Sequence, residues 1–101
     1  MSEDKVIVEV DEDLEDLIPG FLENRHKDIE KLRQAVTASD LETLRSIGHS
    51  LKGVGGGYGF DKMSELGAGI ETAAKSEQLD AITSCITDLE TYLSKIDIKF
   101  V

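Results

Sequence analysis

Apolar residues recur along most of the chain at alternating steps of three and four, which is the period of one face of an α-helix. Four such stripes occur, in residues 21–36, 44–58, 63–73 and 79–96. Helices of about four to five turns that are joined by short connections pack as antiparallel neighbours. The pattern therefore predicts an all-α protein, an antiparallel up-down four-helix bundle.

The helix starts carry their own signals. Pro19 fits the first turn of the first long helix, where its missing N–H costs no hydrogen bond. Ser39 is followed three residues later by Glu42, which is the sequence form of a capping box. This pair places the start of the second helix near Asp40. A polar stretch at residues 75–78 separates the third helix from the fourth.

The two ends of the chain have a different pattern. Residues 6–10 form a β-branched run, and residues 96–101 alternate between apolar and polar side chains, as strands do. We expect residues 11–18 to form a short helix just before the first long helix. We expect the two ends to pair as a small two-stranded ribbon packed on the bundle, because an isolated pair of strands is unstable in water. The alternative is that both ends fray.

The composition is that of a single globular domain. The chain has 101 residues, of which 40% are apolar and 32% charged. We therefore expect one domain over residues 1–101, with a helical core at about residues 11–95. The formal net charge of −10 repels phosphate backbones and anionic lipid. This charge argues against nucleic acid and membranes as partners.

Cysteine usage and apolar runs point to the cytoplasm. Cys85 is the only cysteine, so the chain has no internal disulfide and no cysteine-rich zinc site. Its place near the apolar stripe of the last helix is that of a small core residue. The N-terminus is acidic, and no apolar run is long enough for a transmembrane helix or a secretory signal. We expect a cytoplasmic protein.

The second helix is rich in glycine. Six of the nine glycines of the chain lie between Gly48 and Gly59. Each interior glycine costs about 0.5–1 kcal/mol relative to alanine, so the five in residues 48–57 weaken the helix by about 3–5 kcal/mol. Gly48 and Gly55 border the apolar stripe, where they would let a neighbouring helix approach closely. The glycines on the polar face need a different explanation.

The polar face of this helix carries His49. Successive helical residues turn by about 100°, so His49 points about 170° away from the apolar stripe, into solvent. The same face holds Arg45, Lys52, Gly53 and Gly56. The two glycines leave the surface beside the imidazole bare, as expected if another molecule must come close to it.

The residues on this face suit nucleophilic chemistry. A neutral imidazole is a nucleophile near neutral pH without the help of a base. Lys52 can stabilise the negative charge of a phosphoryl group on the ring nitrogen. The pattern places no second histidine, cysteine or carboxylate cluster beside His49 to complete a triad or bind a metal ion, and Glu42 is two turns away. A partner must therefore supply the rest of the catalytic machinery.

The glycine-rich segment also resembles a family signature. Residues 49–59 read His-Ser-Leu-Lys-Gly-Val-Gly-Gly-Gly-Tyr-Gly. This resembles histidine-containing phosphotransfer (HPt) domains, in which the histidine is followed by any residue, Leu, Lys, Gly and mostly small residues, with another Gly ten positions after the histidine. Leu66, Ile70-Glu71 and Ala73-Ala74 fit the next helix of that family. The resemblance covers essentially the whole chain. It implies a four-helix bundle that receives a phosphoryl group and passes it on within a phosphorelay.

The resemblance also implies roles for single residues. His49 would accept the phosphoryl group through Nε2, Lys52 would stabilise it, and Gly53 would keep the imidazole accessible. Gly59 would serve the turn into the next helix. Three consecutive glycines at residues 55–57 depart from the commoner pattern, which has Ser and Ala there. The chain would need no cofactor of its own, because the catalytic aspartate and Mg²⁺ belong to the partner's receiver domain.

The implied partners are response-regulator receiver domains, a hybrid histidine kinase, or both. We expect them to dock on the His49 face and on residues of a neighbouring helix, namely Phe21, Leu22 and Arg25. Arg45 is either part of this docking surface or a simple exposed charge. We expect the domain to act as a monomer and as a phosphocarrier, not an enzyme.

Two other functions remain open. The domain is alternatively the substrate module of a dedicated kinase, as in chemotaxis-type kinases, or a helical docking module whose histidine is never phosphorylated. We do not expect a nucleotide site, because the G-x-G-x-x-G spacing fails at every register and the segment before the glycines is expected to be helical. His26, between Arg25 and Lys27, is expected to be an ordinary solvated side chain.

Overall fold

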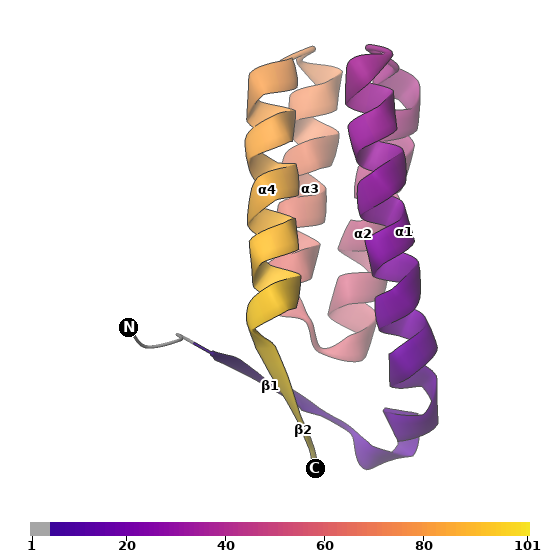
Figure 1. Cartoon of the computed structure of the whole chain (residues 1–101), viewed down its shortest axis with the longest axis vertical. Helices are drawn as coiled ribbons and strands as arrows, with labels where there is room; N and C mark the ends of the chain where they lie inside the picture. The colour runs from indigo at the N-terminus through magenta and orange to yellow at the C-terminus, as the bar shows by residue number, and fades with distance from the viewer. Residues whose placement is uncertain (1–4) are drawn as a thin grey trace.

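Four antiparallel helices form the body of the protein in a computed structural model, which describes residues 5–101 (Figure 1). The helices are α1 (Ile18–Thr37), α2 (Leu41–Tyr58), α3 (Asp61–Lys75) and α4 (Leu79–Lys95). They run alternately up and down, which confirms the predicted bundle. Within residues 5–101, no helix is both long and apolar enough to cross a membrane.

The start of α2 differs in detail from the expected capping box. The capping residue is Asp40, whose carboxylate accepts hydrogen bonds from the Thr43 backbone N–H at 3.1 Å and from the Thr43 hydroxyl at 2.6 Å. These bonds hold the pKa of the Asp40 carboxyl below its usual value. Ser39 lies one residue before the capping Asp40, at a φ of 55°. The predicted position was right and the predicted capping residue was wrong, because the aspartate one residue later satisfies the first turn.

The other helix ends follow the sequence signals. Pro19 stands in the first turn of α1. The α2 helix continues unbroken through the three consecutive glycines and ends at Gly59, which has a φ of 89°. Glycine adopts this left-handed conformation without the penalty that a Cβ would bring. Gly59 thus makes the turn into α3, as the resemblance implied.

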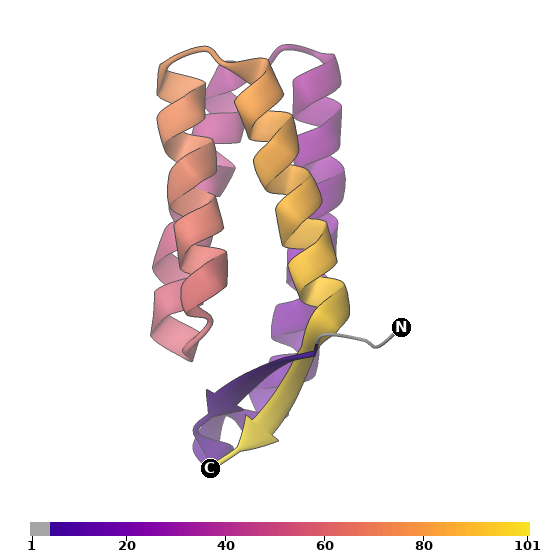
Figure 2. The same cartoon turned by 90° about the vertical axis from the view of Figure 1, so that its left-hand side faces the viewer.

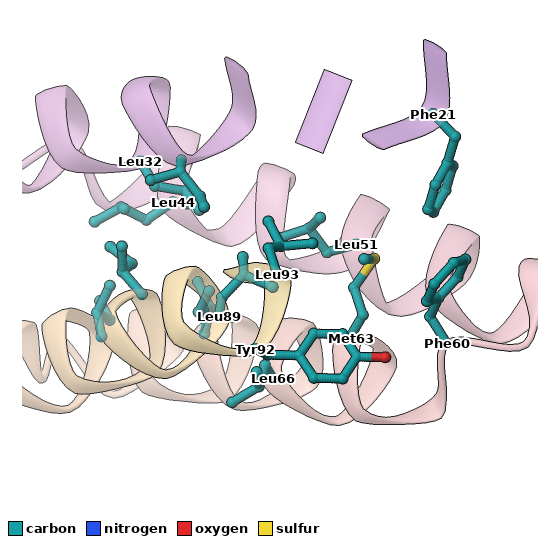
Figure 3. Packing of buried hydrophobic residues seen from close by; sticks show 14 of the residues in the cluster. Phe21, Leu32, Leu44, Leu51, Phe60, Met63, Leu66, Leu89, Tyr92 and Leu93 are labelled. Carbon is teal, nitrogen blue, oxygen red and sulfur yellow. The ribbon is translucent and has the colours of Figure 1, made fainter. Parts of the chain in front are cut away.

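The predicted apolar stripes meet in one core between the four helices (Figure 3). Each of the four helices contributes side chains with no exposed surface. They include Leu32, Leu44, Leu51, Met63, Ile70, Ile82, Ile86 and Leu89. Two large core residues were not among the apolar positions expected at steps of three and four. Phe60, in the connection between α2 and α3, is fully buried, and Tyr92 on α4 is 6% exposed. Cys85 is half-buried beside the core, close to its expected place.

The chain ends pair as a parallel ribbon of β1 (Val6–Val10) and β2 (Ile96–Phe100), with Val8 opposite Ile98. Figure 2 shows the two strands side by side below the helices. Val8 and Val10 are 7% and 1% exposed, so the ribbon is packed on the core. The expected ribbon is confirmed, and the alternative of fraying ends is wrong for residues 6–100. Residues 1–4 of the acidic N-terminal segment lie outside the described residues.

The strands run parallel because of how the chain enters and leaves the bundle. The β2 strand continues the downward direction of α4, while β1 leads into the 3₁₀ helix η1 (Glu12–Leu17), from which α1 rises (Figure 1). The pairing extends one residue beyond the strands, since Val101 N–H donates to the Val10 carbonyl at 2.9 Å and Glu12 N–H donates to the Val101 carbonyl at 3.0 Å. The ribbon lies at the lower end of the bundle (Figure 1).

Candidate functional site

His49 lies in the middle of α2, on the face turned away from the core. Its side chain is 71% exposed, which confirms the prediction from the helical period that His49 points into solvent. The second histidine, His26, is also exposed and has no described hydrogen bond or ion pair. Among residues 5–101, no group of three or more His, Cys, Asp or Glu side chains is arranged to hold a metal ion.

Glycines bring α2 and α3 into backbone contact beside His49. A Cβ added to Gly48 would lie 2.8 Å from the backbone nitrogen of Glu71, and one added to Gly67 would lie 2.5 Å from the nitrogen of Lys52. A Cβ at Gly55 would lie 2.7 Å from the nitrogen of Ser64. Real Cβ atoms do not approach backbone this closely, so only glycine fits at these positions. The close packing expected for Gly48 and Gly55 is therefore present, and Gly67 contributes to it from α3.

This contact places the carboxylate of Glu71 against the imidazole of His49. The distance from His49 Nδ1 to Glu71 Oε2 is 3.1 Å, and the Glu71 side chain is only 12% exposed. A neutral imidazole has one N–H, and a carboxylate accepts it, so Nδ1 carries the proton in this arrangement. The other ring nitrogen, Nε2, then holds the free lone pair. Lys75 Nζ also lies 3.8 Å from the same Oε2.

Sequence reasoning did not find the role of Glu71. The helical periodicity placed no carboxylate near His49 except Glu42 on the same helix, because it describes each helix separately. The contact depends on how α2 and α3 are registered against each other. The signal that could have found it is Gly67, which lies one helical turn before Glu71 and marks where α3 touches α2.

The surface around His49 is open on its Gly53 side. A Cβ at Gly53 would meet no atom within 4 Å, and one at Gly56 would meet only the Ser64 hydroxyl, at 3.8 Å. Lys52 and Arg45 are exposed on α2, and neither forms an ion pair within the described part of the chain. The Lys52 carbonyl accepts a hydrogen bond of 2.7 Å from Ser64, which ties this turn of α2 to α3.

The expected docking residues of α1 lie in different surroundings. Phe21 is 7% exposed, and its ring stacks on Tyr58 and Phe60, with centroids at 4.4 and 5.2 Å. Figure 3 shows Phe21 and Phe60 facing each other at one end of the core. This burial argues against direct contact of Phe21 with a partner. Leu22 is half-buried at the edge of the core, where its outer surface remains accessible.

Arg25 occupies the one position on the α1 stripe where an apolar residue would be expected. Its guanidinium lies 4.8 Å from the centroid of the Phe21 ring, a cation–π distance. Its Nε is 3.0 Å from an Asp28 carboxylate oxygen, and its side chain is 12% exposed. The arginine thus packs over the ring of Phe21, and its charge is paired with Asp28 on the same helix.

Comparison with known proteins agrees with this geometry. A protein-family model described as "Hpt domain" matches residues 6–98. No curated protein and no solved structure matches the chain significantly. The family match covers β1, all four helices and the first three residues of β2. Hpt domains carry out histidine phosphotransfer in phosphorelays as phosphocarriers, not enzymes, and they interact with receiver domains. The chain belongs to the Hpt domain family.

Proposed function

We propose that His49 is the residue that carries the phosphoryl group in this Hpt domain. The observation that carries this proposal is the exposed imidazole with Nδ1 held by Glu71 at 3.1 Å, which leaves Nε2 free toward solvent. His26, the other histidine of the chain, has no comparable partner among the described residues. Only His49 combines exposure with a fixed ring orientation.

The transfer follows from this orientation. The Nε2 lone pair attacks the phosphorus of an aspartyl phosphate on the receiver, the N–P bond forms, and the P–O bond to the aspartate breaks, which regenerates the aspartate carboxylate. The Nδ1 proton stays on the ring and continues to face Glu71, which balances the positive charge that develops on the imidazole. The receiver contributes the aspartate and Mg²⁺, so the cofactor requirement lies with the partner.

Lys52 and the glycines shape the surroundings of the phosphoryl group. Lys52 lies one turn after His49 on the same side of α2, so its ammonium can pair with the phosphoryl oxygens. Gly53 and Gly56 present no side chain in front of the imidazole. A receiver must bring its aspartate within bonding distance of Nε2, and we propose that these glycines provide the necessary room.

The docking surface that we propose joins α2 and α1. It consists of Arg45, Gly53 and Gly56 on α2 together with Leu22 and Arg25 on α1. Its two arginines and the half-buried Leu22 suit a transient complex, in which a polar rim surrounds a small apolar centre. The family match over residues 6–98 supports one domain across residues 1–101. We propose that this domain works as a monomer in the cytoplasm.

The experiment that tests this function uses two donors. The purified protein is incubated either with a phosphorylated receiver domain or with a histidine kinase catalytic domain and ATP, and a second receiver is then added. A relay intermediate gains label from the first receiver and loses it to the second. Label from the kinase domain alone would favour the kinase-substrate module, and partner binding without any transfer would favour the docking module.

A further inference from the structure

We propose that Lys75 is a positioning residue of the site, acting on His49 through the carboxylate of Glu71; this rests on the proposed role of His49. One oxygen, Glu71 Oε2, receives both contacts, from His49 Nδ1 at 3.1 Å and from Lys75 Nζ at 3.8 Å. Lys75 follows Glu71 by four residues on α3, so the two side chains lie on the same face of that helix. The contacts thus link Lys75 to Glu71 and Glu71 to the imidazole of His49.

The burial of Glu71 explains why the lysine matters. The Glu71 side chain is 12% exposed, whereas His49 and Lys75 are 71% and 61% exposed. A carboxylate that is largely withdrawn from water needs hydrogen bonds or a cation to stay in place. His49 supplies a hydrogen bond but, as a neutral imidazole, no charge. Within residues 5–101, Lys75 is the cation in contact with this carboxylate.

Loss of the lysine therefore acts on the histidine indirectly. Without Lys75, the carboxylate gains by turning toward water, where it is better solvated, and Nδ1 then loses its acceptor. The proton is no longer confined to Nδ1, so the share of rings with a free Nε2 lone pair falls. Lys52 cannot replace Lys75 in this role, because it has no described contact with Glu71 and belongs to the next turn of α2.

A double-mutant cycle separates this indirect role from direct attraction of the phosphoryl group. We expect Lys75→Met to slow phosphorylation of His49 by about two- to threefold, the size typical of an exposed pair four residues apart. Lys75→Arg should restore the rate, and Lys62→Met, an exposed lysine on the first turn of the same helix, should leave it unchanged. In a Glu71→Gln background, where no carboxylate remains, Lys75→Met should have no further effect. An equal loss in both backgrounds, or no loss in either, would overturn the proposal.

A spectroscopic readout tests the same coupling without any phosphoryl donor. Nitrogen-15 NMR distinguishes imidazoles protonated on Nδ1 from those protonated on Nε2. The wild-type protein should show His49 protonated mainly on Nδ1, and Lys75→Met should shift the population toward Nε2 while the folded spectrum is otherwise kept. An unchanged His49 spectrum in Lys75→Met would contradict the positioning role. If the wild-type protein accepts no label from any donor, the proposed function fails, and this spectrum still decides the question of Lys75.

Discussion

Gly48 of α2 lies so close to Glu71 of α3 that a Cβ on the glycine would be 2.8 Å from the glutamate backbone nitrogen. His49 is the next residue after this contact, and its Nδ1 is 3.1 Å from the Glu71 carboxylate. The short spacing between the helices thus sets the geometry of the site. Glycine at this position lowers the stability of the helix, but it permits the close helix contact that positions the imidazole.

Gly67→Ala tests whether this spacing holds the site together. The new methyl group would lie 2.5 Å from the Lys52 nitrogen and 2.7 Å from the Gly48 carbonyl oxygen, so α2 and α3 must move apart. We expect the free energy of unfolding to fall by about 1–3 kcal/mol, as in other overpacked cores. Phosphorylation of His49 should also slow in the fraction that remains folded. Urea denaturation and a transfer assay measure the two effects, and wild-type values for both would refute the role of the glycine contact.

Gly53→Ala tests the open surface beside His49. A Cβ at Gly53 meets nothing within 4 Å, so alanine should stabilise the helix by about 0.5–1 kcal/mol. Transfer from a receiver should nevertheless become slower, because the methyl group stands where the partner approaches. Gly57→Ala is the matched control: its Cβ also meets nothing, and it lies about 12 Å along the helix from His49, whereas Gly53 lies about 6 Å from it. If both variants gain stability and both keep the wild-type transfer rate, Gly53 does not serve access.

Val10→Ala tests the contribution of the ribbon to stability. Val10 is 1% exposed, and removing two buried methyl groups should lower the free energy of unfolding by about 2 kcal/mol. Val6→Ala on the same face of β1 is the control. Val6 is 40% exposed, so this substitution should lower the free energy of unfolding much less.

Deletion of residues 1–10 should lower the melting temperature by several degrees. A deletion that leaves the melting temperature unchanged would show that the ribbon contributes nothing.

Tyr92 gives the stability a dependence on alkaline pH. Burial raises the pKa of its hydroxyl to about 12, and the nearby charge of Asp61 adds to the effect. The unfolded chain loses this proton near the ordinary tyrosine pKa of about 10, so rising pH favours unfolding. The stability that Tyr92 contributes is therefore complete below about pH 10 and is lost as the pH rises through about 12. Denaturation of wild type and Tyr92→Phe across this window should give a shallower decline for the variant, and parallel declines would contradict the assignment.

The sequence was sufficient for the elements and for the exposed side of the site. Steps of three and four located the helices, and the direction of His49 followed from the turn of about 100° per residue along one helix. What it could not predict depends on contacts between elements. The parallel direction of the ribbon and the burial of Phe21 beneath Arg25 arise from packing, and Glu71 reaches His49 only because Gly48 and Gly67 bring two helices together.

Locating the phosphoryl group tests the central claim most directly. The chain has two histidines, so wild type, His49→Gln and His26→Gln are each incubated with a phosphorylated receiver and Mg²⁺, and the label is mapped. We predict an acid-labile, alkali-stable label on His49 in wild type and in His26→Gln, and no label in His49→Gln. Transfer of label to His49→Gln, or its loss in His26→Gln alone, would contradict the assignment of His49.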